Sequence, residues 1–230
     1  MNLIEQSLGA LARGIPGATQ VFHEHKLDFC CGGKHSLQEA AAERGIDVQP
    51  IVDRLRTLAS LATREERDWR TVPAATLIEH ILFRFHDRHR EQLPELIRLA
   101  RRVEQVHGDR PDCPVGLADH LTVMQQELES HMQKEEQVLF PMLARGHAMA
   151  LQGPVTVMRN EHDQHGEALQ RLEALTNDIT LPRGACNTWR ALYVGLAALR
   201  EDLMEHIHLE NNILFEGLNP APAEAETAHG

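Results

Sequence analysis

The sequence predicts an all-α protein in which a small helical domain precedes a four-helix bundle. Three observations predict this fold: almost no segment alternates like a strand, apolar residues recur every three or four positions over four long segments, and breaks containing Gly and Pro separate those segments. The 230 residues are enough for a sizeable core and for one domain plus a small second one. We expect the small domain over residues 1–65, the bundle over 70–218 and a disordered tail over 219–230.

Four segments are expected to form the helices of the bundle. They run over about 74–106, 116–143, 154–176 and 188–215. In the second and fourth segments the apolar stripe advances by alternating steps of three and four residues, which is the spacing of a bundle core. The same counting places Val138 and Ile213 on the core stripe near the ends of these two segments.

A ten-residue pattern occurs twice, once in the second segment and once in the fourth. Both copies read His-x-x-x-Glu-x-x-(Val/Ile)-Leu-Phe, with His131 and Glu135 in the first and His206 and Glu210 in the second. Residues four apart lie on one face of a helix, so each copy presents an imidazole and a carboxylate to the same place. A hydrogen bond within one helix could explain a single copy. Two copies on core stripes favour metal ligands, because a buried carboxylate needs a partner or a cation.

Histidines on the other two segments would complete a metal site. His162 lies on the inner stripe of the third segment, whereas His86 and His89 both lie near the inner stripe of the first, so periodicity does not choose between them. One of these two, His162 and the two His–Glu pairs together provide four imidazoles and two carboxylates. Such a set suits two iron ions bridged by the carboxylates, with positions open for oxo, water or a small molecule. Manganese and zinc accept the same ligand types, so iron is favoured but not dictated.

Five segments of the chain resemble the Repair of Iron Centres family, which are bacterial di-iron proteins with a hemerythrin-like bundle. The segments are Leu27–Lys34, Phe85–Pro94, Ser130–Pro141, Glu161–Asp163 and His206–Phe215, so the resemblance covers essentially the full length. It implies a hemerythrin-like bundle and two iron ions with oxo and carboxylate bridges. Carried over position by position, it implies the metal ligands His86, His131, Glu135, His162, His206 and Glu210. The resemblance therefore favours His86 over His89 on the first segment.

Two further acidic residues lie beside the predicted ligands. Glu127 precedes His131 by one helical turn, and Glu161 adjoins His162. Each is either a solvated charge or a group that orients a ligand or guides iron in or out.

Cys30 and Cys31 form a second candidate site. They lie on a Gly-Gly turn before a helix that we expect to begin near Ser36, with Lys34 nearby. A helix N-terminus and a nearby cation favour the thiolate form. The pair is either one buried and one incidental thiol or, as the resemblance supports, a thiol relay that binds iron in transit or reacts with nitric oxide.

Composition limits the partners and the location. The net charge is -11 and no run of Lys or Arg suggests a nucleic-acid surface. No apolar stretch approaches the roughly 18 residues of a membrane span, and the first residues do not read as a signal peptide. We therefore expect a cytoplasmic protein with no membrane partner. The sequence does not determine the oligomeric state, and a homodimer is compatible with it.

The ligand set and the resemblance together favour a stress-response protein. The leading hypothesis is repair of iron–sulfur clusters damaged by nitrosative or oxidative stress, through donation of iron to damaged iron–sulfur proteins or to an assembly scaffold. Enzymatic activity stays open, because the same site would suit reduction of nitric oxide to nitrous oxide. A third hypothesis is a protein that binds or senses oxygen or nitric oxide, although the Cys30-Cys31 pair has no evident use in a pure carrier.

Overall fold

The computed structural model describes residues 2–15, 17–30, 32–61, 69–145 and 151–216. Within these ranges the regular elements are helices, and one isolated β-bridge joins Ser7 to Ser36. This confirms the all-α class. The tail that we expected to be disordered and the segment 62–68, which includes the end of the small domain as predicted, lie outside the described residues, as does Cys31. Among the described helices, none has both the length and the apolar character that crossing a membrane requires.

Four short helices form an N-terminal module. They are α1 (Leu8–Gly14), α2 (Ala18–Glu24), α3 (Leu37–Arg44) and α4 (Gln49–Leu61). Helix α3 begins where the sequence predicted, because Ser36 and Glu39 form a capping box. The Ser36 hydroxyl oxygen accepts a hydrogen bond from the Glu39 N–H at 3.2 Å, and the Glu39 carboxylate accepts one from the Ser36 N–H at 2.8 Å.

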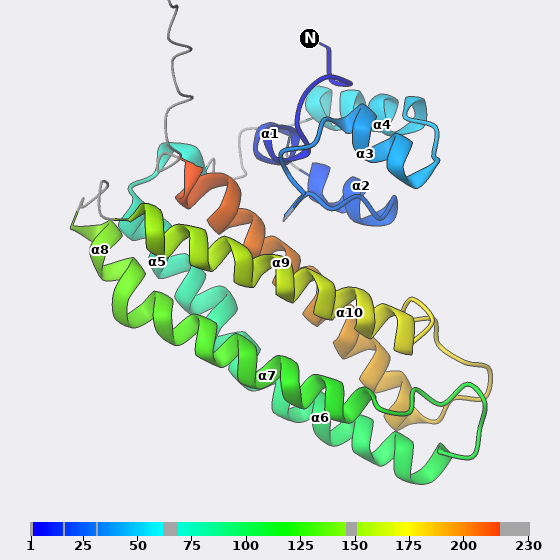
Figure 1. Ribbon diagram of the computed structural model, residues 1–230. Coiled ribbons are helices and arrows are strands. Elements are labelled where there is room, and N and C mark those ends of the chain that lie inside the picture. The colour runs from blue at the N-terminus through cyan, green and yellow to red at the C-terminus, as the bar shows by residue number, and fades with distance from the viewer. Residues whose placement is uncertain (1, 16, 31, 62–68, 146–150, 217–230) are drawn as a thin grey trace, which may run out of the picture.

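Four long helical segments lie side by side and form the bundle (Figure 1). The first comprises α5 (Ala74–Ile81), η2 (Leu82–His86) and α6 (Asp87–His107), after a short 3-10 turn η1 (Trp69–Thr71). The second comprises α7 (Leu117–Lys134), η3 (Glu135–Leu139) and α8 (Phe140–Ala144). The third is α9 (Gln152–Leu175), and the fourth comprises α10 (Asn187–Leu209) and η5 (Glu210–Leu214). The four predicted bundle helices are thus confirmed.

Three of these segments contain a π-helical turn, which the sequence analysis did not anticipate. The turns are η2, η3 and η5. In each, a backbone N–H bonds to the carbonyl five residues earlier instead of four, as between Phe215 and Glu210 at 2.8 Å. Such turns insert one extra residue into a helix and are frequent at functional sites. Here η3 and η5 begin at the two glutamates of the repeated pattern, and η2 ends at His86.

The π-helical turns change which side chains face the core. Val138, which we expected on the core stripe, is 50% exposed, whereas the next residue, Leu139, is 1% exposed. In the second copy Leu214 is buried and Ile213 only partly so. The prediction for Val138 was wrong because counting in steps of three and four assumes regular α-helix, and the extra residue rotates the following side chains.

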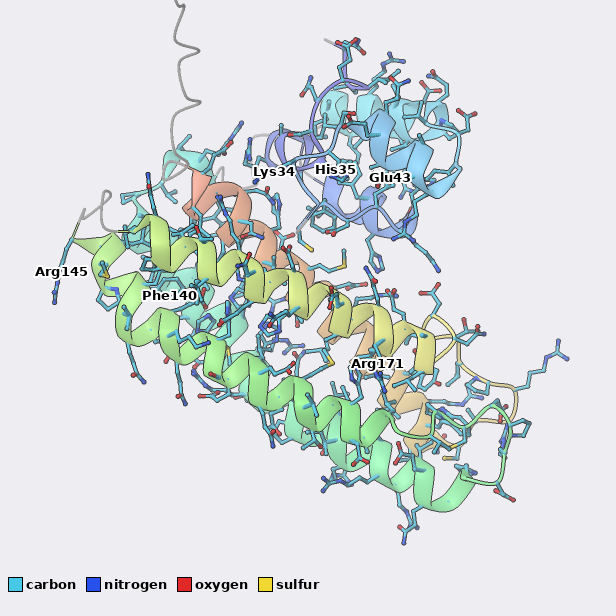
Figure 2. All side chains as sticks on the ribbon, viewed as in Figure 1. Lys34, His35, Glu43, Phe140, Arg145 and Arg171 are labelled. Atoms are coloured by element: carbon cyan, nitrogen blue, oxygen red, sulfur yellow. The ribbon has the colours of Figure 1, made fainter. Side chains whose placement is uncertain are left out.

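Two apolar clusters fill the bundle, one on each side of a polar layer. The larger extends from the bundle into the N-terminal module and includes Leu96, Leu121, Leu172 and Leu196. The smaller includes Phe85, Met158, Phe215 and Phe140, the first residue of α8, which is labelled in Figure 2. On each long helix the predicted ligands fall between the two clusters, as Glu135 does between Met132 and Leu139. The site is therefore enclosed by apolar packing along the bundle axis.

The N-terminal module packs against the side of the bundle formed by α9 and α10 (Figure 1). Within the described ranges, ion pairs connect them: Arg13 lies 2.8 Å from Glu216, and Lys26 lies 2.6 Å from Asp178. The larger apolar cluster also contains residues from both parts. The module is thus docked on the bundle, an arrangement that the sequence could not predict.

Candidate metal centre

The six predicted ligands meet in the polar layer between the two clusters. One imidazole or one His–Glu pair comes from each long helical segment, and every one of these residues is buried. These residues are His86, His131, Glu135, His162, His206 and Glu210. They form two groups of four, and both groups contain both glutamates. We call the two groups the His86–His206 half and the His131–His162 half, after the imidazoles that distinguish them.

Glu135 directs one carboxylate oxygen to each half. Its Oε2 lies 3.4 Å from Nε2 of His86, and its Oε1 lies 3.4 Å from Nε2 of His131. Because Glu135 begins η3 one helical turn after His131, its carboxylate stays on the face that carries that imidazole. A single carboxylate in this position can serve both halves.

Glu210 has the same arrangement on the opposite side of the layer. Its Oε1 lies 3.3 Å from Nε2 of His206, and its Oε2 lies 3.0 Å from Nε2 of His162. The two imidazoles of each half also face each other, with Nε2–Nε2 distances of 3.2 Å between His86 and His206 and 3.1 Å between His131 and His162. In each group of four, one potential ligand atom from each residue lies within 4.8 Å of those of the other three.

This donor set fits metal cations. No carboxylate oxygen of Glu135 or Glu210 accepts a well-aligned hydrogen bond within the described residues, although all four oxygens are buried. Two neutral imidazoles whose Nε2 atoms face each other also bring two lone pairs together unless one carries a proton. A cation would bind both the unpaired carboxylate oxygens and the facing imidazole lone pairs. Imidazole and carboxylate together suit iron, manganese or zinc.

The electrostatics of the two glutamates differ. Burial and repulsion by Glu210 raise the pKa of Glu135 to about 7. Burial would also raise the pKa of Glu210, but the nearby imidazoles of His206 and His162 favour its charged form and hold the pKa well below its usual value. Without a cation, the polar layer thus favours the charged form of Glu210 but not that of the adjacent Glu135. A bound cation would reduce the repulsion between the two carboxylates and allow both to be charged.

Glu161 lies outside the two groups of four and contacts one of their members, His131. We call a residue in such a position an outer contact. Oε2 of Glu161 accepts a hydrogen bond from Nδ1 of His131 at 2.9 Å, and its Oε1 lies 2.5 Å from the ammonium of Lys134. The hydrogen bond with His131 lowers the pKa of Glu161 to about 2. Burial opposes the charged form of His131, but Glu135 and Glu161 raise its pKa to about 10. The structure places Glu127, by contrast, on the exposed side of α7, and no hydrogen bond or ion pair among the described residues involves it.

Sequence reasoning missed two other outer contacts. Nδ1 of His86 lies 2.8 Å from Oε1 of Glu136, and Nδ1 of His162 lies 2.9 Å from Oδ1 of Asn211. Glu136 also pairs with Arg90 at 2.9 Å. Glu136 and Asn211 occupy the same position of the repeated pattern, directly after its glutamate. A polar residue at this position in both copies was the signal that could have identified them.

His89 and His165 are buried beside the site but belong to neither group of four. Their ring centroids lie 5.4 Å from that of His206 and 5.0 Å from that of His131, respectively. On the first long helix the geometry therefore brings His86, and not His89, to the two glutamates.

Cys30 lies where the N-terminal module meets the bundle. Its side chain is 4% exposed, and its thiol donates a hydrogen bond to Oδ1 of Asp28 at 3.2 Å. Its backbone carbonyl accepts a hydrogen bond from Nδ2 of Asn211 at 3.1 Å. Cys30 also lines a cavity of about 260 Å³ between the module and the bundle. Lys34, which we expected near the thiols, is exposed on the module (Figure 2).

The bundle with its buried His–Glu layer defines a cation-binding protein of the hemerythrin class. Residues 77–218 match the family described as Hemerythrin HHE cation binding domain, and residues 4–59 match ScdA_N, a domain of unknown function (DUF542). The chain is 52% identical over 215 residues to the iron–sulfur cluster repair protein YtfE of Dickeya chrysanthemi and equally identical to that of Yersinia pseudotuberculosis. Identity to the YtfE protein of Citrobacter koseri is 51%. Each alignment covers 94% of this chain and 97% of the relative.

The chain belongs to the family of the iron–sulfur cluster repair protein YtfE. This confirms the resemblance to the Repair of Iron Centres proteins that the sequence segments indicated.

Proposed function

We propose that this chain is a di-iron protein that repairs iron–sulfur clusters damaged by nitrosative or oxidative stress, and that it does so by donating iron. The observation that carries the proposal is the pair of four-residue groups that share both glutamates. Relatives named as iron–sulfur cluster repair proteins, 52% identical over nearly the full length, support the repair role.

In this proposal each half of the site holds one iron ion. Each ion would be held by the two imidazoles of its own half together with Glu135 and Glu210, which both halves share. With four protein residues around each ion, such a site would leave room for a small ligand such as nitric oxide or oxygen. Glu136 and Glu161 hold His86 and His131 through Nδ1, which keeps the Nε2 lone pairs directed at the ions.

The ligand types favour release of iron after reduction. Carboxylate oxygens are hard ligands, so they interact more strongly with ferric than with ferrous iron. One electron per ion from an external donor therefore weakens binding without any change in the protein ligands. The ferrous ion is the cargo, and the damaged cluster or an assembly scaffold is its acceptor. Cys30 and Cys31 are proposed to receive the ion on this route. The reason is that the backbone oxygen of Cys30 accepts a hydrogen bond from Asn211, the residue directly after Glu210.

A transfer experiment tests donation. Protein loaded with ⁵⁷Fe is reduced and mixed with an apo iron–sulfur protein, a sulfide source and a chelator that competes for free iron. Labelled iron should appear in the rebuilt cluster. The Glu210→Ala variant should transfer none, whereas Glu167→Ala, which changes an exposed glutamate on α9, should transfer as the wild type does.

The result that would refute donation is transfer no faster than from free ferrous iron. In that case the same preparation is exposed to nitric oxide with a reductant. Nitrous oxide formed over many turnovers would identify an enzyme, and reversible binding without turnover would identify a gas-binding protein.

A further inference from the structure

Asn211 connects a predicted metal ligand to the loop that carries Cys30. Its Oδ1 lies 2.9 Å from Nδ1 of His162, and its Nδ2 lies 3.1 Å from the backbone oxygen of Cys30. The side chain therefore links two segments that are 181 positions apart in the sequence. It is the residue directly after Glu210, at the start of η5.

The carbonyl of Cys30 determines how this link is polarised. A backbone carbonyl only accepts hydrogen bonds, so the amide nitrogen of Asn211 must face Cys30 and the amide oxygen must face His162. An amide oxygen also only accepts, so Nδ1 of His162 must carry the hydrogen. The Nε2 lone pair of His162 is then free to face the two glutamates, which is the tautomer that binds a metal.

The module contacts the neighbouring residue as well. Asn212 donates a hydrogen bond from Nδ2 to the backbone oxygen of Phe29 at 3.1 Å, and its own backbone oxygen accepts one from Arg13 at 2.8 Å. Gly33 lies so close that a Cβ there would come within 2.8 Å of Oδ1 of Asn212. Asn212 thus docks the same loop, but it makes no hydrogen bond to any of the six predicted ligands within the described residues.

We propose that Asn211 is a positioning residue that couples docking of the Cys30 loop to iron retention in the His131–His162 half. The inference rests on the proposed function in one respect, that His162 is an iron ligand. When the loop is docked, the Cys30 carbonyl holds the amide and thereby the metal-binding tautomer of His162. When the loop leaves, the amide is free to rotate and the other tautomer becomes accessible. Because such coupling is reciprocal, iron in this half also favours the docked loop.

Amide hydrogen exchange of residues 27–37 tests the coupling, with iron-loaded and chelator-stripped protein compared. In the wild type, iron should slow exchange about tenfold, the lower end of what outer contacts contribute to metal affinity. Asn211→Asp keeps an acceptor for Nδ1 of His162 but cannot donate to Cys30. In this variant iron content should stay at the wild-type value while the effect of iron on exchange falls to less than about twofold.

Asn212→Asp is the matched control. It removes the corresponding donor to Phe29 one residue along, so exchange should be faster in both states but should still slow about tenfold on iron loading. The comparison of the two variants distinguishes coupling through Asn211 from a general stiffening of the bundle by iron. The proposal is overturned if iron slows the exchange of residues 27–37 in Asn211→Asp as much as in the wild type. It is also overturned if the wild type binds iron but its iron-loaded and stripped forms exchange at the same rate. A wild type that binds no iron would instead overturn the proposed function and this inference with it.

A spectroscopic measurement separates the two contacts of Asn211. In Asn211→Leu both hydrogen bonds are lost, so one of the two ⁵⁷Fe Mössbauer signals should change and one equivalent of iron should pass to a chelator about tenfold faster. Asn211→Asp should restore the slow release, because it restores the acceptor for His162. Equal acceleration of both iron equivalents in Asn211→Leu would show a merely structural role.

Discussion

The two halves of the site use the same ligand types but differ in what holds them. In the His131–His162 half both imidazoles have a partner at Nδ1, Glu161 for one and Asn211 for the other. In the His86–His206 half, His86 contacts Glu136, whereas Nδ1 of His206 is buried with no hydrogen bond among the described residues. Among the described residues, a contact of this kind links the His131–His162 half, and not the other half, to the N-terminal module.

This difference shows that a repeated sequence pattern does not produce equivalent surroundings. His131 and His206 occupy the same position of the repeat, yet Nδ1 of His131 contacts a carboxylate whereas Nδ1 of His206 has no hydrogen-bond partner within the described part of the chain. Phe85 instead stacks on the ring of His206, with 5.4 Å between centroids and an interplanar angle of 2°. We therefore expect the two halves to hold iron with different strength, and the following substitutions test this from the largest effect to the smallest.

Loss of either glutamate should abolish iron binding in both halves. Glu135→Ala and Glu210→Ala each remove one ligand from both groups, which leaves three donors to each ion. Iron content, measured by elemental analysis, should fall below about a tenth of the wild-type value, since removal of a ligand costs more than the 10–100-fold typical of an outer contact. A variant that kept one full equivalent of iron would show that the carboxylates are not shared.

Loss of one imidazole should remove one ion and spare the other. His86→Ala and His162→Ala each affect a single half, so each variant should retain about half of the wild-type iron. The remaining Mössbauer signal should differ between the two variants, because a different half survives in each. Identical residual spectra would contradict the assignment of the ligands to two halves.

Loss of an outer carboxylate should weaken one half without emptying it. Glu161→Gln removes the charged partner of His131, and Glu136→Gln removes that of His86. Each should lower the affinity of its own half about 10–100-fold, as measured by competition with a chelator. Glu167→Gln, an exposed change on α9, is the matched control. If Glu161→Gln and Glu136→Gln affected both halves equally, the outer contacts would act on the bundle as a whole.

A substitution in the larger apolar cluster should leave both halves unchanged. Leu196 is fully buried on α10, about 15 Å along the helix from His206. Leu196→Ala should lower the free energy of unfolding by about 2–5 kcal/mol through loss of packing. Denaturant unfolding measures this loss, and the iron content of the folded variant should equal that of the wild type. A fall in iron content would mean that packing at this distance positions the ligands.

Four of the six candidate ligands could be identified from spacing alone. His131 with Glu135 and His206 with Glu210 lie four residues apart on core stripes, and helical geometry brings such residues to one face whatever surrounds them. The choice of His86 over His89 could not be made in this way, because residues three apart share nearly the same face. It depends on where η2 ends, and therefore on backbone hydrogen bonds that periodicity does not reveal.

The sequence by itself determined the all-α class, the four bundle helices and the paired His–Glu pattern, because these follow from local periodicity within single helices. Only the tertiary structure decided the outer contacts and the docking of the Cys30 loop. His162 and Asn211 are 49 positions apart, and Asn211 and Cys30 are 181 apart. Contacts over such separations depend on how whole helices pack and where π-helical turns interrupt them, and no spacing rule within a segment contains that information.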